Sequence, residues 1–149
     1  MAKAKPEYEV VEEFGRMANR IVAKYPDLFY GVNVDEIRCV KIINKSRPVT
    51  KNTLWQLEAV KMPIRLDCRF GWYITLFADD WDEMDERHKL LLVAEILHGV
   101  PTNKEDEGKV NSFDTKGYAT MFRTFKTIDY LSESNVPHIL KEDVNWVKL

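Results

Sequence analysis

The sequence predicts one α+β domain over residues 1–149, and three observations indicate this class. Two segments repeat apolar residues at three- and four-residue spacing, the period of a helix that packs on a core. Between them lie short runs of β-branched and aromatic residues, which favour strands. A chain of 149 residues with 45% hydrophobic side chains is also sufficient to fill a single core. We expect an N-terminal helix, a small, mainly antiparallel sheet of three or four strands, a motif-bearing helix and C-terminal helical segments.

The expected elements follow from local patterns. An amphipathic helix is expected from Glu7 to Tyr25, because Pro26 disfavours helical geometry in the residue before it. Acidic side chains crowd the start of the motif-bearing helix, and Asp82 is its expected N-cap. Residues 1–6 are expected to be flexible. The remaining expectations are strands at Ile37 to Ile43, Thr53 to Val60 and Trp72 to Phe77, helices at Glu83 to Gly99 and Thr115 to Thr127, and an apolar tail, Val136 to Leu140, that packs back on the core.

The composition excludes several classes of protein. No apolar run approaches the roughly 20 residues that span a bilayer, and the N-terminus lacks the apolar core of a secretory signal, so we expect a cytoplasmic protein without a membrane partner. Cys39 and Cys68 lie in strand-like segments without a CxxC pair, which indicates reduced thiols. Phosphate-binding glycine loops and a Gly-x-Ser-x-Gly elbow are missing from the sequence, which argues against nucleotide and serine-hydrolase chemistry.

Charge is distributed unevenly along the chain. Residues 1–78 carry 13 basic and 9 acidic side chains, whereas residues 79–149 carry 9 basic and 15 acidic ones. The stretch 36–70 alone holds eight basic residues against three acidic ones and is interleaved with aromatic residues, a pattern that can serve nucleic-acid binding. The acidic second half and a pI near 6.0 argue against such a role, so nucleic acid is not an expected partner.

The segment that can carry chemistry is Ala94-Glu95-Ile96-Leu97-His98. Zinc proteases use HExxH on a helix, because two histidines one turn apart bind one metal while the glutamate activates a metal-bound water. Here the glutamate and the second histidine are present, and alanine occupies the position of the first ligand. His88 lies ten residues from His98, about 15 Å of helical rise, so these two histidines cannot share one ion.

Further ligands for a metal at this helix would come from downstream. Asp114, or one of Glu105, Asp106 and Glu107, is a candidate carboxylate ligand beside His98. Without a metal, Glu95 and His98 would form a local pair at the helix surface or, if they face the core, bind neighbours such as Tyr118 and Arg123.

This region resembles the zincin-like phage metallopeptidase family. The resemblance is carried by the strand Trp72 to Phe77, Trp81-Asp82, and the helix segment Leu91 to His98, in that order, and more loosely by the runs Phe113-Asp114, Tyr118 to Phe125, Asp129 to Leu131 and Val136 to Leu140. It implies an N-terminal helix and a small twisted sheet before the motif helix. It also implies a degenerate HExxH motif, since alanine has no donor atom.

The expected function is therefore that of a pseudo-metallopeptidase: a non-catalytic, phage-type protein that binds a macromolecule, in particular a host or phage protein, without a cofactor. One alternative is a metal-dependent hydrolase with an atypical ligand set, in which Glu95 is catalytic and His98 and Asp114 bind zinc. The other is a nucleic-acid-binding module that uses residues 36–70.

Overall fold

The computed structural model describes residues 5–48, 54–101, 108–111, 118–126, 130–132 and 136–147. Its strands are β1 (Tyr8–Val10), β2 (Ile37–Ile42), β3 (Trp55–Ala59) and β4 (Trp72–Phe77). Its helices are α1 (Glu12–Lys24), α2 (Ile64–Asp67), α3 (Ala78–Asp82), α4 (Glu86–Leu97) and α5 (Ala119–Phe125), with short 3₁₀ turns η1 (Val34–Glu36) and η3 (Tyr130–Ser132).

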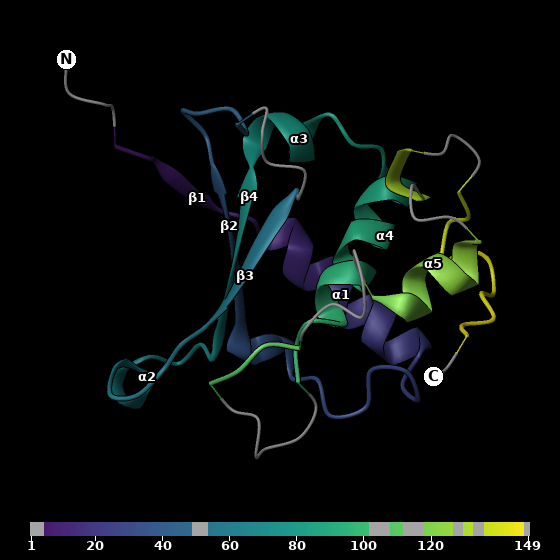
Figure 1. Ribbon diagram of the computed structural model, residues 1–149, viewed down its shortest axis with the longest axis horizontal. Helices are drawn as coiled ribbons and strands as arrows, with labels where there is room; N and C mark the ends of the chain where they lie inside the picture. Colours follow the sequence, from purple (N-terminus) through teal and green to yellow (C-terminus); the bar gives the residue numbers. More distant parts are fainter. Residues whose placement is uncertain are drawn as a thin grey trace.

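The four strands form one sheet in the order β1-β2-β4-β3. The pairings β1–β2 and β3–β4 are antiparallel, and β2–β4 is parallel. The α+β class and the mainly antiparallel sheet are therefore confirmed. Helices α1 and α4 lie together on one side of the sheet (Figure 1). Helix α2 lies within the β3–β4 connection. It projects from the sheet, away from the other helices (Figure 1).

The core lies between the sheet and these two helices. Alternate residues of β4 are buried, as the period of a half-buried strand requires. The buried face of α1 consists of Phe14, Met17, Ala18 and Ile21. Helix α4 is buried on nearly all sides from Leu90 to Leu97, so it is the central helix of the fold. The tail also packs on the core as expected, because Val136 and Ile139 are buried.

The expected start of the first helix, Glu7, is wrong. Tyr8 to Val10 belong to a strand, and the first helix begins only at Glu12. These residues pair with β2, and the backbone amide of Val11 donates to the carbonyl of Cys39 at 2.9 Å. Sheet pairing thus prevails over a helical pattern that the apolar spacing also fits. Of the expected flexible residues 1–6, only Lys5 and Pro6 are described.

The expected N-cap of the motif helix is also wrong. Asp82 ends α3, a separate short helix, and Asp85 is the N-cap of α4, where its carboxylate accepts the backbone amide of His88 at 2.9 Å. Cys68 follows α2 and does not lie in a strand, whereas Cys39 is buried in β2, and both thiols are free. The helix expected from Thr115 to Thr127 is observed as α5; residues 115–117 and 127 lie outside the described part.

Gly15 in the first half of α1 offers a direct test of helix stability. A Cβ atom at this position would meet nothing within 4 Å, and the residue does not have a positive φ. Glycine inside a helix costs about 1 kcal/mol relative to alanine. Gly15→Ala should therefore raise the free energy of unfolding by up to about 1 kcal/mol in urea denaturation. A decrease in stability would mean that the space beside Gly15 is not open.

Candidate functional site

The last turns of α4 place the three motif positions differently. Ala94 is fully buried in the core, whereas Glu95 and His98 are only partly buried and face β3 and the C-terminal segments. His88 does not join them. Its ring binds the carboxylate of Asp85 at 2.6 Å near the start of the helix. Of these polar side chains, only Glu95 and His98 therefore lie together at the end of the helix.

Both carboxylate oxygens of Glu95 accept hydrogen bonds from aromatic side chains. The indole Nε1 of Trp55 donates to Oε2 at 2.8 Å, and the hydroxyl of Tyr130 donates to Oε1. Burial raises the pKa of Glu95 above its ordinary value, although both donors act in the opposite direction. Of the two neighbours expected for Glu95 and His98, Tyr118 stacks on His98, and the side chain of Arg123 is exposed.

His98 has one ring nitrogen bonded and one buried without a partner. Nδ1 lies 2.7 Å from the carbonyl oxygen of Ala94, so it must carry the proton that it donates. Nε2 then holds a lone pair, and it is buried without a hydrogen-bond partner in the described part of the protein. The rings of Phe29, Tyr118 and Trp146 surround the imidazole at centroid distances of 5.0, 6.0 and 6.0 Å. This burial lowers the pKa of His98.

The described residues do not fit a catalytic zinc ion. Three protein ligands are the usual minimum for such a site. Ala94 has no atom that can bind a metal, and both oxygens of Glu95 accept hydrogen bonds. His98 Nε2 is the one metal-binding atom of the motif that has no hydrogen-bond partner in the described part of the protein. Within the described ranges, no group of three His, Cys, Asp or Glu side chains could hold a metal ion. Asp114 and the carboxylates of Glu105, Asp106 and Glu107 lie outside those ranges.

A groove runs along the edge strand β3, beside the motif. It consists of two adjoining pockets of about 430 and 190 Å³ that share Leu57 and Val110. The smaller pocket is also lined by Trp55 and Tyr118, whose rings are stacked with centroids 6.4 Å apart. As far as the structure describes it, this lining includes neither Glu95 nor His98. Trp55 binds Glu95 and Tyr118 stacks on His98, so the two rings separate the motif from the groove.

Close packing at the end of α4 fixes the wall of the groove. The amide of Asn111 donates to the carbonyl of Gly99 at 2.8 Å, and its side chain donates to the carbonyl of His98 at 2.9 Å. A Cβ atom at Gly99 would lie 2.5 Å from the hydroxyl of Tyr118 and 2.7 Å from Leu57. Only glycine permits this approach. The wall of the groove is thus fixed by packing and hydrogen bonds within the fold.

The opposite charges of the two halves of the sequence meet in internal ion pairs. Lys41 in β2 binds Asp82 at 2.9 Å, and this contact raises the pKa of Lys41. Arg47 binds Asp80 at 3.0 Å. Within the first half, Arg65 binds Glu36 at 3.4 Å. Part of the basic stretch 36–70 is therefore neutralised within the fold. Trp55, one of its aromatic residues, is buried in the core.

Comparison with known proteins gives no relative for this chain: no family model, curated protein or solved structure matches it. In the described residues, no helix is long and apolar enough to cross a membrane. The candidate site is therefore defined by its own geometry. Glu95 and His98 have the spacing found in the zinc-protease motif. Trp55 and Tyr130 donate hydrogen bonds to Glu95, and aromatic rings surround His98.

Proposed function

We propose that this protein is a non-catalytic, zincin-like scaffold that binds a host or phage protein. The observation that carries the proposal is the incomplete metal site beside Glu95: Ala94 has no donor atom, and both oxygens of Glu95 accept hydrogen bonds, from Trp55 and Tyr130. A general base needs an oxygen within hydrogen-bond reach of the proton that it removes. The smaller pocket of the groove along β3 is lined mainly by aromatic and apolar side chains, among them Trp55, Leu57 and Tyr118, and not by the motif residues.

A second surface supports binding of a macromolecule. At the tip of the β3–β4 connection, the side chains of Met62, Ile64 and Leu66 are 65%, 69% and 74% exposed. The tip is held in place by Arg65, which donates to the carbonyl of Cys68 at 2.6 Å. Three large apolar side chains on an ordered, projecting element are typical of protein interaction sites. Figure 1 shows this tip at α2, remote from the core helices.

The absence of catalysis is tested on untagged protein. We expect no stoichiometric transition metal by elemental analysis and no hydrolysis of an unstructured protein such as casein, with or without added zinc. Glu95→Gln is the matched control, because it keeps the shape of the side chain and removes the carboxylate. Zinc-dependent hydrolysis that is lost in Glu95→Gln would support the alternative of a metal-dependent hydrolase and refute the proposal.

The binding surface is tested by capture of a partner from a host lysate. The variants each introduce one aspartate, at different places on the surface. Ile64→Asp and Leu66→Asp place a charge on the α2 tip, whereas Tyr30→Asp alters a side chain that is 82% exposed elsewhere. We expect a captured protein to be lost, by about tenfold or more, from the two α2 variants and retained by Tyr30→Asp. Equal capture by all three variants would exclude the α2 tip as the docking surface.

A further inference from the structure

The four-stranded sheet has two edges, and they differ in their capacity to pair with a further strand. In the described part of the chain, β1 and β3 each pair with a single strand and form these edges (Figure 1). An edge strand presents backbone N–H and C=O groups to which another strand can bind. Proteins block such edges with charged side chains and proline. An edge without these features is therefore a candidate site of association.

At β1, symmetric pairing of two copies brings glutamates together. The carbonyl of Glu7 accepts the amide of Ile43 at 3.0 Å. Hydrogen-bonded residues alternate along an antiparallel pair, so Glu9 also faces β2 and the backbone of Tyr8 faces outward. Registers centred on Glu7, Tyr8 or Glu9 place two glutamates directly opposite each other, which is unfavourable for like charges. These charges disfavour pairing of β1 with a second copy.

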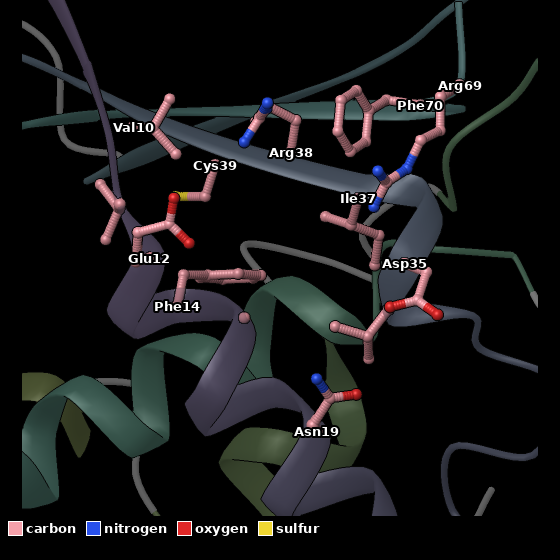
Figure 2. A pocket seen from close by; sticks show the side chains of 13 residues that line it. Val10, Glu12, Phe14, Asn19, Asp35, Ile37, Arg38, Cys39, Arg69 and Phe70 are labelled. Atoms are coloured by element: carbon pink, nitrogen blue, oxygen red, sulfur yellow. The ribbon is translucent and has the colours of Figure 1, made fainter.

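The two ends of β1 also interrupt this edge. Pro6 precedes the strand and has no N–H to donate. Where β1 is followed by α1, a pocket of about 210 Å³ lies beside residues 37–39 of β2. Figure 2 shows Glu12, Arg38 and Arg69 around this pocket. Charged side chains thus border the part of β2 that does not pair with β1.

The outward-facing backbone of β3, in contrast, borders the groove. The amide of Val60 donates to the carbonyl of Gly71 at 2.7 Å. Because hydrogen-bonded pairs alternate, Glu58 also binds β4, whereas the N–H and C=O groups of Leu57 and Ala59 point away from it. Among the described residues, these groups of Leu57 and Ala59 have no hydrogen-bond partner. Both residues line the pocket of about 430 Å³, so this edge is accessible.

One register between two β3 strands has complementary side chains. When Leu57 lies opposite Leu57 of a second copy, Gln56 lies opposite Glu58 in both halves of the pair. These are the non-hydrogen-bonded positions, at which facing side chains approach most closely. An amide can donate to a carboxylate, as Gln56 does to Glu58 within one chain at 2.6 Å. Registers centred on Gln56 or Glu58 instead oppose two identical side chains, and two glutamates repel each other.

We propose that two copies of this chain associate through antiparallel pairing of their β3 strands, which forms one continuous sheet with four strands from each copy. Leu57 of each copy exchanges backbone hydrogen bonds with Leu57 of the other, and two Gln56–Glu58 contacts fix the register. The interface involves one short strand from each copy, so the dimer is weak. This association does not rest on the proposed binding of a host or phage protein, because the α2 tip lies outside β3.

Sedimentation equilibrium of the full chain, from about 10 μM to 1 mM, tests the association. We expect a monomer–dimer equilibrium with a Kd on the order of 100 μM. The mass of a monomer at every concentration would overturn the proposal.

Charge exchange at two exposed positions tests the register. Gln56→Glu places two pairs of carboxylates opposite each other and should weaken dimerisation about tenfold. Adding Glu58→Gln to this variant restores an amide opposite each carboxylate and should recover the original Kd. Gln56→Lys creates two pairs of opposite charge and should strengthen dimerisation. The same Kd for all of these variants would refute the proposed register and, with it, the proposal.

Proline substitutions distinguish the two edges of the sheet. Ala59→Pro removes an outward-facing N–H that does not bind β4, and should abolish dimerisation at 1 mM within the roughly tenfold range that sedimentation resolves. Tyr8→Pro is the matched control, because it removes an outward-facing N–H from β1 and should leave the Kd unchanged. Dimerisation that is lost in Tyr8→Pro and retained in Ala59→Pro would place the interface at β1 and exclude β3. The charge-exchange variants provide a result that does not depend on how Ala59→Pro folds.

Discussion

Replacing Ala94 by histidine is expected to raise the affinity of the protein for zinc by at least about tenfold, because a second imidazole nitrogen joins the first. Residues 94 and 98 lie one helical turn apart on α4. His98 already donates its Nδ1 proton to a backbone carbonyl and leaves Nε2 free, which is the arrangement of most metal-binding histidines. Calorimetric titration of both proteins with zinc measures the change.

The same substitution should destabilise the metal-free protein. Ala94 is fully buried, and a larger side chain in a packed core costs about 1–3 kcal/mol. Zinc should recover part of this loss in Ala94→His, because a ligand of the folded state stabilises it. Ala94→Leu is the control, since it adds similar bulk without a donor atom and should not respond to zinc. If the natural chain binds zinc as tightly as Ala94→His, Ala94 is not the position of a lost ligand.

Local patterns were sufficient for most of the fold. The strand β4 has the bounds expected from its aromatic and β-branched residues, and β2 and β3 lie within the expected ranges. The errors occur where two local structures fit the same residues. Tyr8 to Val10 suit a strand or a helix, and pairing with the distant strand β2 selects the strand. Asp82 and Asp85 can both cap a helix. Because Asp82 belongs to the separate helix α3, Asp85 is the cap of α4.

The candidate site could be found from the sequence only in part. The spacing of Glu95 and His98 is a local property of one helix, so the motif is visible without a structure. Their partners are not: Trp55 lies 40 residues before Glu95, and Tyr130 lies 35 residues after it. Trp55 is buried in the core, and a buried indole N–H requires a hydrogen-bond partner. That requirement was the available signal.

The pH dependence of stability should report the state of Glu95. Its pKa is raised in the folded protein, so the folded state holds this proton more tightly than the unfolded state does. The contribution of Glu95 to stability is therefore fully present below the ordinary value of 4.5 and is lost as pH rises through the raised pKa. His98, whose pKa is lowered, acts in the opposite sense, and its contribution is lost as pH falls below 6.5. Because the two contributions oppose each other, the effect of Glu95 on the free energy of unfolding is measured as a difference between variants.

Tyr130→Phe is expected to lower the free energy of unfolding by about 1–3 kcal/mol at pH 7, because it leaves a buried carboxylate oxygen without its donor. The loss should shrink as pH falls towards 4.5, since protonation of Glu95 removes the charge that needs the donor. In a Glu95→Gln background the same substitution should cost less and show no such pH dependence. Urea denaturation of the four proteins between about pH 4 and 8 measures both effects. A pH-independent loss, equal in both backgrounds, would mean that the hydroxyl of Tyr130 acts through a partner other than Glu95.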